Sequence, residues 1–165
     1  MNDEKGLKEM RNPIKNNIYI IIAFSLFFAS CDNKTVYHSF LHIPETGWQK
    51  KDTLSFNIEI KDSMTYVHLS AELRNRSDYP YQNVYLSISY NLQDSTTWKT
   101  DTLELSLADN GGKWLGRGWG NLYQTSFPIG NVLVVHPGKY SVRVSHEMKD
   151  NSLAGINDVG IRIEK

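Results

Sequence analysis

Cys31 has the most specific chemistry in this 165-residue sequence, because it is the single cysteine and it closes the tetrapeptide Phe28-Ala29-Ser30-Cys31. The pattern is that of a lipobox. Small residues at positions 29 and 30 let a signal peptidase approach the bond before Cys31. The Cys31 sulfur then accepts a diacylglyceryl group, and its freed amine can take a further acyl chain such as palmitate. Each buried CH₂ is worth roughly 0.8 kcal/mol, so two or more chains anchor stably. The sequence therefore predicts a protein held on a membrane by lipid on Cys31.

The segment before Cys31 has the layout of a signal peptide. Basic residues come first (Lys5, Lys8, Arg11 and Lys15), and the apolar residues 18–28 follow. This apolar run is shorter than the ~18 residues of a spanning helix, which favours a cleaved signal peptide at residues 1–30 over an uncleaved anchor helix. Residues 31–35 are then the lipidated cysteine and a short tether. The tether lacks successive acidic residues, a frequent mark of surface export, so we expect a periplasm-facing protein of the cell envelope.

The five histidines do not form a predicted metal site. His38 and His42 have a spacing that ligand pairs use on a helix, but in an extended segment their rings lie roughly 13 Å apart. Asp150 stands where the zinc-protease motif starting at His146 requires its second histidine. Asp109 and Asn110 carry oxygens suited to Ca²⁺, although a turn also explains them. No metal ligand set and no cofactor are predicted.

Nucleophilic catalysis has no motif in this sequence either. The serines lack a Gly-x-Ser-x-Gly elbow, and lipidation uses Cys31. We therefore predict no catalytic residue and a protein that is not an enzyme.

The most unusual stretch of the chain combines glycines, aromatic rings and cations in residues 113–123. Glycines allow a close approach of the backbone to a ligand, and indole rings stack on sugars. Four residues are thus candidates for a ligand or partner surface: Lys113, Trp114, Arg117 and Trp119. The Gly-Lys-Ser/Thr ending of a phosphate loop is missing. The alternative is a strand kinked by glycines whose tryptophans pack in the core.

Two serines lie in a short Asp-Ser-x pattern known from bacterial O-glycosylation. They are Ser63 in Asp62-Ser63-Met64 and Ser95 in Asp94-Ser95-Thr96. Both fall among turn-forming residues, where a bulky sugar can be carried, so both are candidate modification sites.

The elements that must position these residues are strands, because the dominant apolar period after residue 35 is two. Leu54, Phe56, Ile58 and Ile60 give the first clear apolar face, and five similar runs follow, at residues 67–73, 84–90, 103–107, 140–144 and 159–163. Broken alternation at residues 37–43, 122–127 and 132–135 indicates further strands. About seven to nine short strands between turn formers predict an all-β fold, an antiparallel sandwich or jelly roll at residues 36–165.

Charge excludes some classes of partner. Eighteen basic residues balance eighteen acidic ones, with no long run of either sign. The chain therefore has no electrostatic footprint for nucleic acid and no polybasic second membrane anchor.

Four separated blocks resemble the gliding-motility lipoprotein family GldH of Bacteroidetes. They are Phe40-Leu41-His42-Ile43-Pro44 with Gly47-Trp48, Tyr79-Pro80-Tyr81-Gln82-Asn83, Gly112-Lys113-Trp114-Leu115-Gly116 with Gly118, and residues 155–163. The resemblance implies an envelope lipoprotein associated with the gliding machinery and supplies no catalytic residues.

Two functions follow as expectations. The first is a lipid-anchored component or accessory of a gliding or related envelope assembly, with envelope proteins as partners. The second is a β-sandwich lipoprotein that binds glycans through residues 114–119. A hydrolase is a distant third.

Overall fold

The computed structural model describes residues 34–165, so the expected signal peptide and Cys31 lie outside the described part of the chain. Residues 34–165 form strands and turns, and none of them belongs to a helix that could cross a membrane. The strands are β1 (Thr35–His42), β2 (Trp48–Gln49), β3 (Leu54–Ile60), β4 (Thr65–Arg76), β5 (Asn83–Tyr90), β6 (Lys99–Ser106), β7 (Arg117–Trp119), β8 (Leu122–Val134), β9 (Gly138–His146), β10 (Ser152–Leu153) and β11 (Ile156–Glu164).

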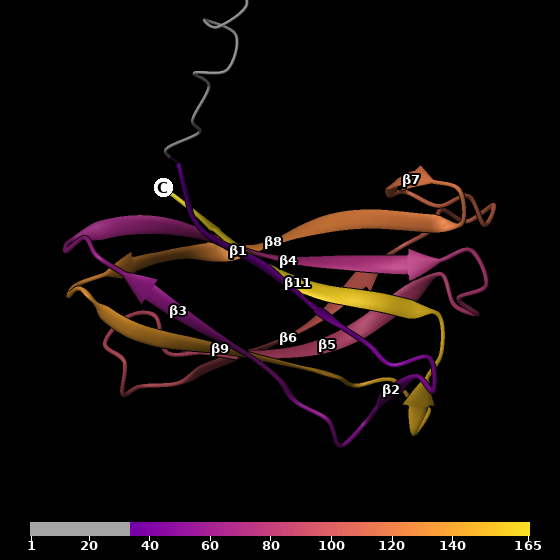
Figure 1. Ribbon diagram of the computed structural model, residues 1–165, viewed down its shortest axis with the longest axis horizontal. Helices are drawn as coiled ribbons and strands as arrows, with labels where there is room; N and C mark the ends of the chain where they lie inside the picture. The colour runs from indigo at the N-terminus through magenta and orange to yellow at the C-terminus, as the bar shows by residue number, and fades with distance from the viewer. Residues whose placement is uncertain (1–33) are drawn as a thin grey trace, which may run out of the picture. The chain divides into compact units, whose positions relative to one another are not determined.

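Two antiparallel sheets face each other, as Figure 1 shows. The five-stranded sheet has the order β1-β11-β4-β8-β7, and the four-stranded sheet has the order β3-β9-β5-β6. The short strands β2 and β10 pair with each other beside them. The all-β sandwich expected from the sequence is confirmed.

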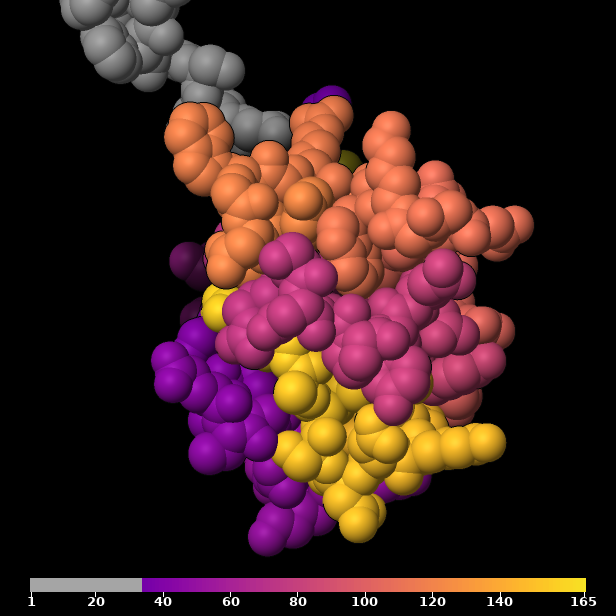
Figure 2. Space-filling view, turned by 90° about the vertical axis from the view of Figure 1, so that its right-hand side faces the viewer, coloured from indigo at the N-terminus to yellow at the C-terminus, as the bar shows by residue number. Residues whose placement is uncertain are grey.

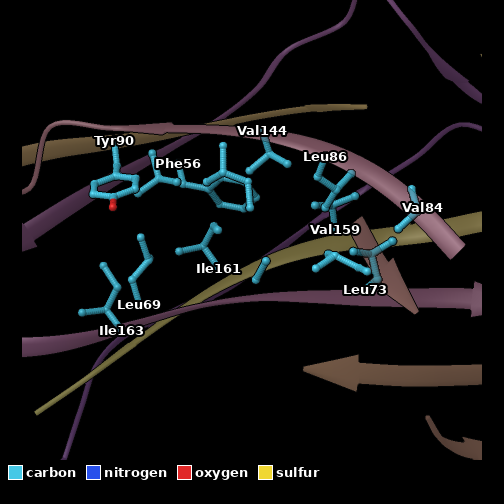
Figure 3. Close-up of a cluster of buried hydrophobic side chains, with 14 of the residues drawn as sticks. Phe56, Leu69, Leu73, Val84, Leu86, Tyr90, Val144, Val159, Ile161 and Ile163 are labelled. Atoms are coloured by element: carbon cyan, nitrogen blue, oxygen red, sulfur yellow. The ribbon is translucent and has the colours of Figure 1, made fainter. Parts of the chain in front are cut away.

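Apolar side chains at alternate positions fill the space between the sheets. Leu69, Leu73 and Ile161 come from the five-stranded sheet, while Phe56 and Leu86 come from the four-stranded sheet; all five are nearly inaccessible to solvent (Figure 3). Burying one such side chain fully contributes roughly 1.5–3 kcal/mol. The two facing apolar rows expected from the alternation are therefore present, and they leave one outer face on each sheet.

The chain enters and leaves the sandwich at the same end. Thr35 in β1 pairs with Glu164 in β11, and the backbone N–H of Lys165 donates to the carbonyl oxygen of Lys34 (2.8 Å). At the opposite end, His42 pairs with Asp158. The β7–β8 hairpin lies at this end too, because the first residues of β8 pair with β7 on one side and with the end of β4 on the other. We call the first the tether end and the second the distal end.

Candidate functional site

A hairpin held by backbone hydrogen bonds begins the glycine-tryptophan segment, residues 113–123. The N–H of Leu115 donates to the carbonyl oxygen of Leu107 (2.9 Å), and that of Gly112 donates to the carbonyl oxygen of Asp109 (2.9 Å). The Asp109 carboxylate accepts the N–H groups of Gly111 and Lys113, both at 2.9 Å. Asp109 therefore acts as a turn residue, the simpler of the two interpretations of its sequence position.

Backbone contact with β8 fixes the middle of the segment. A Cβ on Gly116 would lie 2.7 Å from the carbonyl oxygen of Gln124, so a larger residue does not fit without a shift. Arg117 then pairs with Gln124 as β7 begins. The hairpin returns through Gly120-Asn121, where Gly120 has a φ of +64°, a conformation that glycine adopts without steric cost.

The two tryptophans of the segment have different environments. Trp114 is half-buried and lies against the rings of Tyr79 and Tyr123, with centroids 6.4 and 5.8 Å away. Trp119, in contrast, is 93% exposed. The segment thus presents one indole to solvent and uses the other in packing.

The exposed residues of the segment form a ridge at the distal end. Lys113, Leu115 and Arg117 are exposed together with Trp119. In Figure 2, which looks onto this end, the salmon-coloured segment that contains these residues projects at the upper right. We call Leu115, Arg117 and Trp119 the distal ridge.

A groove of about 550 Å³ lies between this segment and the outer face of the five-stranded sheet. Leu115 and Arg117 line it from the segment, whereas Glu72, Gln124 and Arg162 line it from β4, β8 and β11. Trp114, Trp119 and Lys113 do not line it. Of the four candidates from the sequence, Arg117 alone reaches this groove.

Glu72 is the most buried ionisable residue of the groove, with 2% of its surface exposed. Its Oε2 accepts hydrogen bonds from His38 Nε2 (2.9 Å) and Gln124 Nε2 (3.2 Å). The Nε of Arg162 lies 3.8 Å from the other carboxylate oxygen. Alternation with Ala71 and Leu73 puts Glu72 on the outer face of the sheet, and it is buried there by the side chains of His38, Gln124 and Arg162 on neighbouring strands.

A second set of charges continues the network toward the distal end. His42 Nδ1 donates to Asp158 (3.1 Å), and Arg74 Nη1 lies 3.6 Å from the other oxygen of Asp158. The Arg74 guanidinium also stacks on Phe40, 3.8 Å from the ring centroid. His38 and His42 therefore contact different carboxylates, and residues 34–165 contain no group of three His, Cys, Asp or Glu residues able to hold a metal ion.

The four sequence blocks that resemble GldH converge at the distal end. A Cβ on Gly155 would meet the Cα of Tyr79 at 2.6 Å, and Tyr79 in turn contacts Trp114. The N–H of Ile43 donates to the carbonyl oxygen of Asn157 (2.9 Å). Burial raises the pKa of Tyr79, whose hydroxyl donates to the carbonyl oxygen of Asn83 (2.9 Å). Residues far apart in the chain thus build one structure beneath the distal ridge.

Ser63 and Ser95 are exposed in turns outside this region. Ser95 has a φ of +64°, and its N–H donates to the carbonyl oxygen of Asn91 (2.9 Å). Their glycosylation stays a prediction.

Comparisons with known proteins agree on one family. The family model described as GldH lipoprotein matches residues 35–163. The gliding motility lipoprotein GldH homolog of Christiangramia forsetii is 33% identical over 157 residues, which cover 90% of this chain and 95% of the relative. The gliding motility lipoprotein GldH of Flavobacterium johnsoniae is 30% identical over 159 residues, covering 92% and 98%.

Solved structures give weaker matches. The sugar-binding C-terminal domain of EclA aligns over 82% of this chain and 78% of its own length, with 13% identity and a TM-score of 0.35. A likeness of this degree carries no argument about ligands. The match over residues 35–163 and the two full-length relatives are decisive: this chain belongs to the GldH lipoprotein family.

Proposed function

We propose that this protein is a lipid-anchored, non-enzymatic component of the gliding-motility machinery or of a related envelope assembly. The observation that carries the proposal is family membership over nearly the whole described chain, with relatives named for gliding motility. Residues 1–30 act as the signal peptide, Cys31 carries the lipid, and the sandwich faces the periplasm.

The distal ridge is the proposed contact with envelope partners. It combines an exposed tryptophan and an arginine, two residue types enriched at the energetic centres of interfaces, with the exposed apolar Leu115. The ridge also lies on the part of the fold where the four sequence blocks that resemble GldH converge. Tethering raises the effective concentration of such a surface toward partners on the same membrane.

Lipidation is tested by fractionation and mass spectrometry. The mature wild-type protein should begin at an acylated Cys31 and fractionate with membranes, whereas a Cys31→Ala variant should not be acylated. An unmodified Cys31 in a full-length chain would refute the anchor.

The partner surface is tested by complementing a deletion strain. A variant with Leu115→Ser, Arg117→Glu and Trp119→Ser should fold normally, yet fail to restore motility or envelope function and lose cross-linked partners. The matched control changes two residues near the tether end, Met64 and Tyr66, which are 68% and 67% exposed, to serine. Full complementation by the ridge variant would contradict the proposed surface.

The alternative function, glycan binding at residues 114–119, has one specific observation in its favour, the nearly complete exposure of Trp119. Trp114 packs against two tyrosines, so Trp119 is the indole of this segment that is open for stacking on a sugar. Retained glycan affinity in a Trp119→Ala variant would eliminate this alternative.

The proposed O-glycosylation of Ser63 and Ser95 is tested by intact mass. Hexose added to the native protein and lost in a Ser63→Ala, Ser95→Ala variant supports it, and an unmodified mass contradicts it.

A further inference from the structure

The outer face of the four-stranded sheet contains a second groove, of about 590 Å³. Five Ser and Thr side chains line it, among them Ser55, Ser87 and Ser145, together with Trp98 and Arg143. These hydroxyl residues alternate with core residues along β3, β5 and β9, and their short side chains leave the sheet surface hollow. The volume is within the range of small-ligand sites, roughly 300–1,000 Å³.

Arg143 occupies the middle of this hydroxyl surface. It pairs with Ser55 of β3 on one side and with Ser89 of β5 on the other. No acidic residue lines the groove, and none of the ion pairs found in residues 34–165 involves Arg143. The groove therefore carries one positive charge that no carboxylate of the described chain offsets.

Trp98 holds Arg143 from one side. The guanidinium carbon lies 4.2 Å from the centroid of the indole ring. A guanidinium whose face lies over a ring directs its N–H donors outward in its own plane, so these donors stay available to a ligand. Trp98 is itself 38% exposed, which leaves part of the indole open to the same ligand.

The loop that supplies Trp98 is fixed before any ligand arrives. The side-chain amide of the buried Asn91 donates to the carbonyl oxygen of Ser95 (2.6 Å) and accepts the N–H of Ser141 on β9 (2.7 Å). Asp94 accepts the N–H groups of Thr96 (3.0 Å) and Thr97 (2.7 Å). Such preorganisation reduces the entropic cost of binding.

We propose that this groove binds an acidic saccharide, with the carboxylate on Arg143 and the sugar hydroxyls on the serine and threonine hydroxyls. A row of hydroxyls that donate and accept matches a ligand of the same kind, whereas phosphate groups mainly accept. The missing carboxylate partner of Arg143 favours an acidic sugar over a neutral one. This site lies on the outer face of the four-stranded sheet, whereas the groove beside the distal ridge lies on the five-stranded sheet. The proposal does not depend on the proposed assembly role.

The test uses the processed lipoprotein in detergent and tri-galacturonate as the probe, measured by calorimetry and Trp fluorescence. Wild type should bind, and binding to α-1,4-galactotriose, the neutral counterpart of the probe, should be at least tenfold weaker. Arg143→Gln should weaken tri-galacturonate binding about tenfold or more, because it removes a charge-assisted hydrogen bond to the carboxylate. The affinity of Arg143→Lys should lie between those of wild type and Arg143→Gln, since lysine keeps the positive charge but lacks the paired N–H donors of the guanidinium.

Two controls make the outcome specific. Trp98→Ala should weaken binding of tri-galacturonate while Trp119→Ala leaves it unchanged, and each variant should melt within a few degrees of wild type. Undetectable binding by wild type at millimolar probe, equal affinity of Arg143→Gln, or competition by millimolar inorganic phosphate would each overturn the acidic-saccharide site.

Discussion

On the outer face of the five-stranded sheet, charged side chains contact one another: Glu72 accepts from His38 and faces Arg162, while Asp158 faces His42 and Arg74. On the outer face of the four-stranded sheet, short hydroxyl side chains surround Arg143, which forms no ion pair with another described residue. The first face uses its charged groups for internal bonding, whereas on the second Ser89 bonds to Thr100 (2.8 Å) and Arg143 has no carboxylate partner among the described residues. Two sheets with the same alternation thus differ in how their outer polar groups are used: the charges of the first are paired with one another, whereas Arg143 on the second is open to the proposed ligand.

The largest loss of stability is expected from a substitution of Glu72. Glu72→Ala removes the acceptor of His38 and Gln124 and leaves Arg162 with Glu164 as its remaining ion-pair partner, so we expect a loss of about 2–4 kcal/mol in the free energy of unfolding. Urea denaturation measures it. The matched change on the other sheet, Glu104→Ala, removes an exposed acceptor of Asn83 and should cost within about 0.5 kcal/mol. Equal costs at the two sites would contradict the assigned roles.

A smaller effect is expected where the glycine-tryptophan segment touches β8. Gly116→Ala places a methyl group 2.7 Å from a backbone oxygen, and relieving this overlap should cost about 1–3 kcal/mol. Gly130→Ala, within β8, meets nothing within 4 Å and should change stability by less than about 0.5 kcal/mol. Thermal unfolding of the two variants distinguishes them, and a neutral Gly116→Ala would show that the segment is not held against the sheet.

The buried His146 should make the stability of the protein depend on pH. Its ring is 1% exposed, its Nε2 contacts the carbonyl oxygen of Trp48 (3.1 Å), and burial lowers its pKa. The unfolded chain, with an ordinary pKa near 6.5, then takes up the proton more readily. The contribution of the neutral His146 ring to the free energy of unfolding should be fully present above about pH 6.5. It should fall as the pH drops toward the folded-state pKa and level off below it.

Denaturation midpoints between pH 7.5 and 5 test this slope. His146→Gln should flatten it, while His42→Gln, at a side chain that is 65% exposed, serves as the control. A slope unaffected by His146→Gln would assign the titration to another group.

The smallest expected effect concerns the loop that holds Trp98. Hydrogen bonds from Thr97 and Thr96 lower the pKa of Asp94 to about 2, so the ionised carboxylate contributes stability above the unfolded value near 3.9 and loses it as pH falls toward 2. Asp94→Ala should leave global stability nearly unchanged but speed hydrogen exchange at the Thr97 amide and shift Trp98 emission. Unchanged exchange would show that the loop does not depend on Asp94.

Sequence alternation predicted the strands well where each strand has one buried face. It divided β8 into residues 122–127 and 132–135, although the structure has one strand. Ser70 pairs with Pro128 while Leu69 pairs with Gly130, so Ile129 is an extra residue in a bulge that shifts the alternation. The two-residue strands β2 and β10 are too short to show a period.

The candidate sites were harder to predict, because they depend on which strands are neighbours. The local sequence singled out Trp114 and Trp119, yet their different exposures follow from contacts with Tyr79 and Tyr123. Arg143 and Trp98 were missed, since neither stands in an unusual stretch. A signal was available in the serines that alternate with core residues at 55, 87, 89, 141 and 145, but only the strand order β3-β9-β5 brings them together.

The pairing of β1 with β11 has a mechanical consequence. The chain enters at the tether end, where Thr35 pairs with Glu164, and the distal ridge lies at the other end of the same sheet, beside β8. A pull between a membrane anchor and a partner on the ridge would therefore run along the strands. Such a load stretches the whole β1–β11 ladder in shear, so its hydrogen bonds resist together instead of opening one after another.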